Sequence, residues 1–152
     1  MPAPSIRHRV IGLKMAAALL QYVEARKLGR VLQAPCDVVL SQKIVIQPDI
    51  LFVKKERRGL FSDMYLRGAP DLVVEISQLA WEKDLKTERR ICGDFGIPEY
   101  WTVDLDACRV ETLVWSELGY VSVGKYHRSQ RLSSPLLSGL NLPLTRIFGS
   151  DD

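Results

Sequence analysis

Three carboxylates stand inside otherwise apolar stretches of the sequence. Asp49 follows Pro48 and precedes Ile-Leu-Phe-Val, and Asp71 and Glu75 belong to the run Gly68-Ala-Pro-Asp-Leu-Val-Val-Glu-Ile-Ser77. A carboxylate in a buried strand is costly unless it is paired, hydrogen-bonded or bound to a cation. Magnesium takes about two carboxylates, a backbone carbonyl and waters where it also holds a phosphate, and such an ion can activate water against a phosphodiester. These acids are therefore candidate metal ligands, although a salt bridge at the wet end of the strand explains Glu75 equally well.

A basic partner for the attacking water is not found beside Glu75 on its own strand. The residue two positions later, which points to the same face, is Ser77. Lys83 and Lys86 lie near the start of the segment that follows, where a side chain can reach back toward the end of the strand. Lys86 is therefore our candidate for the basic partner of the attacking water.

The composition is that of a soluble protein with one domain, residues 1–152. The chain is 47% apolar and 26% charged, and its net charge of +3 permits a polyanionic partner without requiring one. Three cysteines without C-x-x-C spacing argue against a disulfide framework or a zinc site, and favour a reducing, cytoplasmic compartment. The apolar patch Met15–Leu20 is too short to span a bilayer, so we expect no membrane contact.

Periodicity predicts an α/β or α+β fold, with a mixed central sheet flanked by helices. Ser5 and Gly29 bound a helix whose expected inner face is Ile6, Val10, Leu13, Ala17, Leu20 and Val23. Strands are expected at 31–40, 44–53, 72–76, 99–104, 108–116 and 120–126, with a second helix at 79–95. The first two strands form a hairpin, and Pro48-Asp49 suggests a bulge or edge in it. Residues 54–67 are expected to be a loop and 132–148 an irregular tail.

Five segments together resemble the Uma2 family (DUF820), which comprises restriction-endonuclease-like proteins that are widespread in bacteria. The segments are Ser5-x-x-His8, Pro48-Asp49-Ile-Leu-Phe-Val, Gly68-Ala-Pro-Asp-Leu-Val-Val-Glu-Ile-Ser77, Asp84, and Gly96-Ile-Pro-Glu-Tyr-Trp-Thr-Val-Asp104. The resemblance covers about residues 5–148. It implies a PD-(D/E)XK nuclease fold.

The resemblance also implies a function and a site. It implies a metal-dependent endodeoxyribonuclease, a hydrolase that uses Mg²⁺ or Mn²⁺ and no small-molecule cofactor. DNA is then the expected partner, and a homodimer the expected assembly. Asp49 and Glu75 become the core metal-binding acids, with Asp71 as a further ligand and His8 as a site neighbour. From the residues alone, a histidine in a first helical turn is more often a solvated surface group.

The sequence departs from the family pattern at several places. The family usually carries lysine and tyrosine where this chain has Glu88 and Cys92, and Ser-Pro-Ser where it has Ser77-Gln78-Leu79. It also usually carries a strand pair before the Ser5 position. Lys86 and Arg89 point roughly 200° and 100° away from Glu88 at about 100° per residue. These departures keep open an alternative, a catalytically degenerate homologue that serves as a dimeric nucleic-acid-binding or protein-interaction module.

Overall fold

The computed structural model describes residues 4–78 and 82–149. Its helices are α1 (Ile6–Ala25), α2 (Glu82–Asp94) and α3 (Thr145–Phe148), with a 3₁₀ helix η1 (Lys55–Leu60). The strands are β1 (Gly29–Gln33), β2 (Asp37–Val39), β3 (Val45–Ile46), β4 (Ile50–Lys54), β5 (Tyr65–Arg67), β6 (Leu72–Ser77), β7 (Glu99–Asp104), β8 (Arg109–Val114), β9 (Val121–His127), β10 (Arg131–Leu132) and β11 (Leu142–Pro143).

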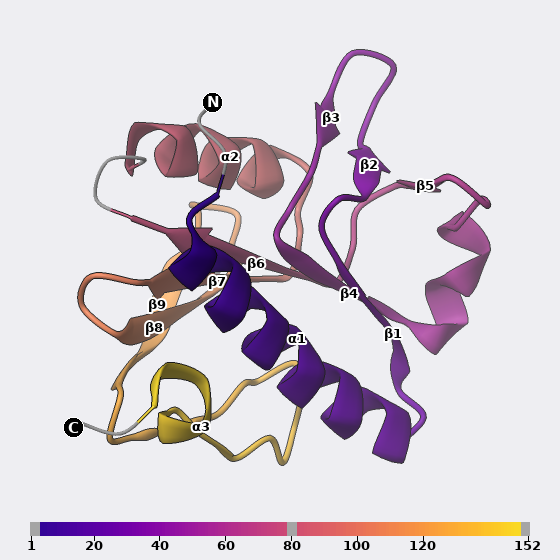
Figure 1. Cartoon of the computed structure of the whole chain (residues 1–152). Helices are drawn as coiled ribbons and strands as arrows, with labels where there is room; N and C mark the ends of the chain where they lie inside the picture. Colours follow the sequence, from indigo (N-terminus) through magenta and orange to yellow (C-terminus); the bar gives the residue numbers. More distant parts are fainter. Residues whose placement is uncertain (1–3, 79–81, 150–152) are drawn as a thin grey trace.

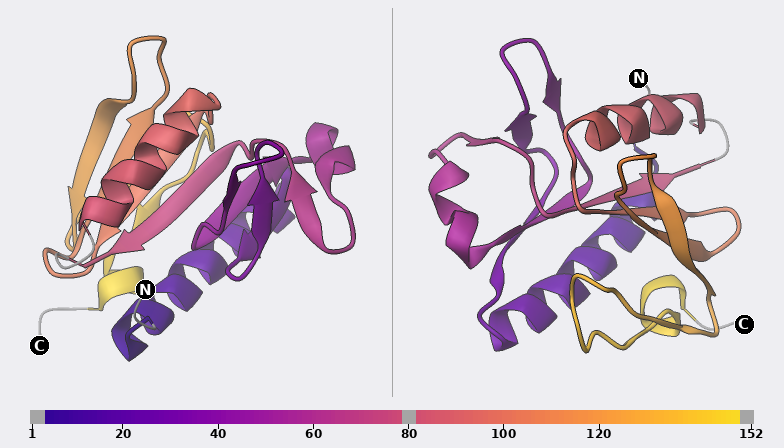
Figure 2. Two further views of the ribbon diagram at one scale, coloured as in Figure 1. Left: turned by 90° about the horizontal axis from the view of Figure 1, so that it is seen from above. Right: turned by 180° about the vertical axis from the view of Figure 1, so that it is seen from behind.

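The central sheet has six strands in the order β1-β4-β6-β7-β8-β9. Its β6–β7 pair is parallel and its other neighbours are antiparallel, so the sheet is mixed. Helix α1 crosses one face, and α2 covers the other (Figures 1 and 2). One core lies between α1 and the sheet, and a second gathers Val73, Cys92 and Tyr100 on the α2 side. The expected α+β fold with a mixed central sheet and flanking helices is confirmed.

The expected first hairpin is present, but each of its strands is divided between two sheets. Strand β1 pairs with β4 in the central sheet, whereas β2 pairs with β3 and β5 in a small three-stranded sheet. Pro35 and Pro48 lie at the two breaks, because proline has no N–H to donate to a ladder. The segment expected to be a loop contains η1 and β5.

Helix α1 buries a different face from the one that its spacing predicted. The buried side chains include His8, Met15, Leu19 and Tyr22, and of the predicted face only Val23 is buried. Gly12 explains the orientation, since a Cβ there would lie 3.2 Å from Ile76 Cδ1, so the glycine lets the helix approach β6 closely. The apolar row at Ile6, Val10, Leu13, Ala17 and Leu20 consequently faces outward.

The C-terminal tail is held on the α1 side of the sheet by its own short elements and by Glu99. Strands β10 and β11 pair with each other, and α3 packs near α1. The buried Glu99 carboxylate accepts hydrogen bonds from Trp101 Nε1 and Ser134 Oγ, which links β7 to the tail. Within the described part of the chain, no helix is long and apolar enough to cross a membrane.

Candidate metal and active site

Asp49 lies at the point where β4 begins, held by a backbone group of β6. The antiparallel register pairs Ile50 with Val74, so Asp49 is placed next to Glu75 on the neighbouring strand. Its Oδ2 accepts a hydrogen bond of 2.7 Å from the Ile76 backbone N–H. That bond fixes the carboxylate while leaving lone pairs on both oxygens for further partners.

Glu75 is a buried carboxyl on the α2 face of the sheet, with 7% of the residue exposed. Burial raises its pKa well above the ordinary value, and the nearby Glu88 and Asp49 carboxyls raise the pKa further. Within the described part of the chain its Oε1 has no hydrogen-bond partner. A buried carboxylate oxygen without a partner is costly, so this arrangement favours a proton or a cation between the acids.

Glu88 and Cys92, the two positions where the sequence departs from the family pattern, both face Glu75 from α2. The Glu88 carboxyl lies within hydrogen-bonding reach of Glu75. Cys92 is fully buried one helical turn later, and burial, then Glu88 and Glu75, raise the pKa of its thiol. An acid thus stands beside Glu75 at the place where a lysine was expected. Cys92 is part of the core on the α2 side of the sheet.

Tyr100 belongs to the same cluster, although the sequence analysis did not single it out. The parallel register pairs Val73 with Tyr100, so the ring lies on the same face as Glu75. Burial raises the pKa of the Tyr100 phenol, and Glu75 raises it further. Its hydroxyl is a second buried polar atom without a hydrogen-bond partner in the described residues. The register of β6 against β7 was the missing signal, since it is not visible from the sequence.

His8 joins the site from the first turn of α1. Ser5 caps that helix by accepting the His8 backbone N–H at 3.1 Å, and Gln78 Nε2 donates to the same Ser5 hydroxyl. The imidazole Nε2 lies 3.4 Å from Asp49 Oδ1. The hydrogen bond to Asp49 raises the pKa of His8, and burial opposes this rise. The structure therefore brings together His8, Asp49 and Glu75.

We expect Asp49→Asn to lower the pKa of His8. The amide removes the charge that raises this pKa, while the burial that lowers it remains. The measurement is an NMR titration of the two imidazole signals, which belong to His8 and to His127 on β9. The His8→Gln variant assigns them, because it keeps only the His127 signal. An unchanged His8 titration in Asp49→Asn would show that the pair does not form.

Asp71 lies apart from the other two acids. It stands four residues before Glu75, which is about 13 Å along a strand. Its Oδ2 accepts the Lys54 backbone N–H at 2.8 Å, and its Oδ1 accepts Arg57 Nη1 at 3.0 Å. Asp71 therefore joins β6 to the start of η1, and the structure does not bring it to Asp49 and Glu75.

Lys86 is an exposed residue of α2. Lys86 lines a cleft of about 390 Å³ between α2 and the β8–β9 turn, together with Trp115 and Tyr120.

Arg89 lines the same cleft as Lys86 and also a neighbouring cleft of about 230 Å³, which contains Ser77 and Thr102. The Arg89 guanidinium carbon lies 5.8 Å from the centroid of the Tyr100 ring. Arg89 is thus a cation of α2 that lies over Tyr100, the neighbour of Glu75. Lys83, Asp84 and Trp81 lie outside the residues whose side chains the structure describes.

The donor set fits a hard divalent cation that keeps several waters. Asp49 and Glu75 supply carboxylate oxygens from adjacent strands, and Glu75 Oε1 has no other partner among the described residues. Two carboxylates with an otherwise aqueous shell suit Mg²⁺ or Mn²⁺. No group of three or more His, Cys, Asp or Glu residues in the described part is arranged to hold a metal by itself.

Comparison with known proteins gives a family and a fold. A family model described as "Uma2: Putative restriction endonuclease" matches residues 1–145. The chain belongs to the Uma2 family. A crystal structure from Anabaena variabilis ATCC 29413, titled a putative nuclease belonging to DUF820, superposes with a TM-score of 0.78 at 17% identity. The match covers 97% of this chain and 83% of that one. At this identity the likeness establishes the Uma2 fold alone, and no curated protein matches the chain.

Proposed function

We propose that this Uma2 protein is a metal-dependent DNA endonuclease in which Asp49 and Glu75 hold Mg²⁺ or Mn²⁺. The observation that carries the proposal is the meeting of these two carboxylates from β4 and β6, one of them with a buried oxygen that lacks a partner. Family membership and the fold support nuclease chemistry in general. A bound divalent cation supplies an activated water and stabilises the charge that develops on a phosphodiester.

The protein's own groups prepare the site for that ion. The Ile76 N–H orients Asp49, and His8 lies on its other oxygen. Without a cation, burial and the nearby Glu88 favour the protonated state of Glu75. Binding of a cation therefore releases that proton. Arg89 and Arg109 line the adjacent cleft and provide positive charge for a phosphate backbone. In this proposal Arg89 takes the place that the sequence analysis gave to Lys86, and Asp71 has a structural role.

The test is plasmid cleavage with Mg²⁺ or Mn²⁺ by the wild type and by Glu75→Ala, with Glu117→Ala as a matched control. Glu117 is an exposed acid in the β8–β9 turn. We expect metal-dependent nicking that Glu75→Ala reduces at least about 100-fold, since loss of the ion removes several kcal/mol of transition-state stabilisation. Glu117→Ala should retain the wild-type rate. Equal nicking by wild type and Glu75→Ala, or none by either, contradicts the proposal.

The orientation of Glu88 toward Glu75 supports a second candidate function. An acid in place of a cation opposes ionisation of Glu75 and leaves the site without a positive charge at that position of α2. The alternative is therefore a homologue that binds nucleic acid without cutting it. It predicts a mobility shift of DNA that weakens steeply as salt rises, with no cleavage in either metal. Robust metal-dependent turnover would exclude it.

A further inference from the structure

The segment that joins β4 to β6 carries a group of exposed cations, which we call the η1 face. It consists of Lys54 at the end of β4, Lys55 and Arg58 in η1, Arg67 in β5, and Arg30 in the neighbouring strand β1. None of these five cations forms an ion pair with a residue that the structure describes. The exposed acids of the same segment are Glu56 and Asp63. The η1 face therefore keeps an excess of positive charge, which attracts an anionic partner.

Helix η1 is fixed to the rest of the fold by its fourth cation, Arg57. Its guanidinium donates to Asp71 Oδ1 at 3.0 Å and to the Ala69 carbonyl at 2.7 Å, both next to the start of β6. The Lys55 backbone N–H donates to the Leu28 carbonyl at 2.9 Å, next to the start of β1. The buried Asp71, which the proposed metal chemistry does not use, thus helps to hold η1 in one position. The exposed cations of η1 are presented from an anchored helix.

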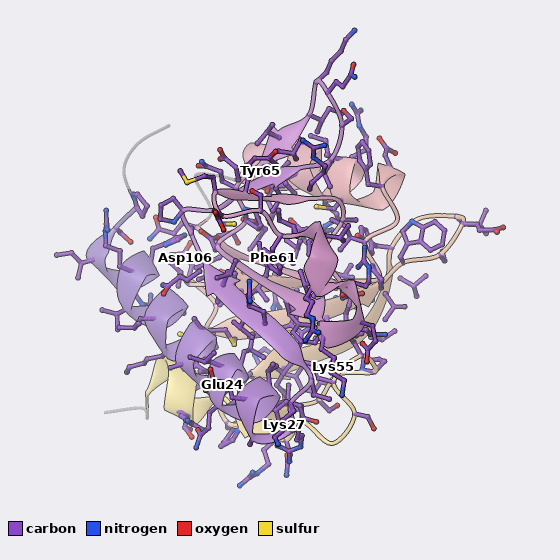
Figure 3. The ribbon with its side chains drawn as sticks, turned by 90° about the vertical axis from the view of Figure 1, so that its right-hand side faces the viewer. Glu24, Lys27, Lys55, Phe61, Tyr65 and Asp106 are labelled. Carbon is purple, nitrogen blue, oxygen red and sulfur yellow. The ribbon has the colours of Figure 1, made fainter. Side chains whose placement is uncertain are left out.

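Two aromatic rings on the η1 face lie under its arginines. The guanidinium carbon of Arg30 lies 4.7 Å from the centroid of the Phe61 ring. That of Arg67 lies 5.7 Å from the centroid of the Tyr65 ring, and its Nη2 donates to the Tyr65 hydroxyl at 2.9 Å. In Figure 3, Tyr65, Phe61 and Lys55 follow one another across this side of the molecule. Because a guanidinium already lies over each ring, the η1 face favours phosphates over stacked, unpaired bases.

The small three-stranded sheet connects the metal site to the η1 face. Its strand β3 ends three residues before Asp49, and its strand β5 carries Arg67. Strand β2 lies between them and pairs with both. Strand β4 makes a second connection, since Asp49 directly precedes it and Lys54 ends it. Five residues along a strand span about 17 Å, which is therefore the scale of the separation between the metal site and the η1 face.

We propose that the η1 face contacts the phosphate backbone of duplex DNA on one side of the cleavage position, an inference that rests on the proposed function. Phosphates of one strand follow one another about every 3.4 Å along a duplex, so about 17 Å corresponds to about five nucleotides. A duplex is stiff over this length and presents its phosphates at a fixed spacing, which matches an anchored row of cations. The substrate class is then double-stranded rather than single-stranded DNA.

The experiment measures DNA binding by fluorescence anisotropy over a range of salt concentrations, in EDTA so that no cleavage occurs. The probes are a labelled duplex of about 20 base pairs, long enough to span the metal site and the η1 face, and one of its single strands. Wild type is compared with the double variant Lys55→Ala and Arg58→Ala. The control is the double variant Lys14→Ala and Lys125→Ala, which removes the same charge from exposed positions on α1 and on β9, at the opposite edge of the sheet from β1. Circular dichroism checks that each protein is folded.

We expect the η1 variant to lower the slope of log K against log salt by about two in magnitude, about one for each lost phosphate contact. Its affinity for the duplex at about 0.1 M salt should fall at least about tenfold, while the control keeps the wild-type slope. An unchanged slope in the η1 variant, an equal loss in the control, or a single strand bound as tightly as the duplex each overturns the inference. The expected binding without cleavage in Mg²⁺ or Mn²⁺ would contradict the nuclease proposal and still support the contact of the η1 face with DNA.

Discussion

Glu88→Lys is expected to increase metal-dependent DNA cleavage by at least about tenfold near pH 7, because a positioned acid–base group typically contributes about 100-fold or more. Glu88 is, after burial, the largest influence that raises the pKa of Glu75. A lysine at the same position of α2 lowers the pKa of Glu75 instead, so that Glu75 is ionised and can bind the cation. The ammonium group also supplies a proton donor near the attacking water. The measurement is the cleavage rate against pH at saturating Mg²⁺.

Two controls separate the possible causes of such a gain. Glu88→Gln removes the repulsion without adding a cation, so its rate should fall between the wild type and Glu88→Lys. Glu117→Lys makes the same change of charge on the exposed β8–β9 turn and tests whether added positive charge alone improves DNA binding. If Glu88→Lys cuts no faster than Glu88→Gln, the lysine has no role of its own. If it cuts more slowly than the wild type, the proposed effect of Glu88 on Glu75 is wrong.

The sequence was informative about this site where local pattern and chemistry agree. Asp49 and Glu75 stand out because a carboxylate inside an apolar strand needs a reason, and the pairing of β4 with β6 places them side by side. Asp71 has the same pattern but a different environment. Its partner Arg57 lies fourteen residues earlier, in a segment expected to be a loop, and only the folded chain shows that η1 brings it there.

The inner face of α1 was missed for a different reason. The helix has two apolar rows, and periodicity alone cannot tell which row meets the sheet. Contacts from distant parts of the chain decide this, namely the close approach of Gly12 to Ile76 and the bond between Ser5 and Gln78. The same limit applies to Tyr100, which reaches Glu75 only through the parallel register of β6 and β7.

Glu75→Gln is expected to abolish cleavage while stabilising the metal-free protein at neutral and alkaline pH. The pKa of Glu75 is raised in the folded state above its ordinary value of 4.5. The folded state therefore holds the proton more tightly, and this contribution to stability is complete below pH 4.5 and lost as pH rises through the folded pKa. Glutamine is neutral and of the same shape, so it avoids this loss, which is about 1.4 kcal/mol for each unit of pKa shift.

The pH dependence distinguishes this effect from ordinary changes in packing. Thermal unfolding of the two proteins without metal should give similar Tm values at pH 4.5, with an advantage for Glu75→Gln that grows as pH rises, by about 2–4 °C per kcal/mol in a chain of this size. Adding Mn²⁺ should stabilise the wild type by mass action and leave Glu75→Gln nearly unchanged. Glu117→Gln, at an exposed acid, should change neither comparison. A variant that is less stable than the wild type at pH 8 would mean that Glu75 has a buried partner that holds it ionised, and the acid pair with Glu88 would then be excluded as the source of its raised pKa.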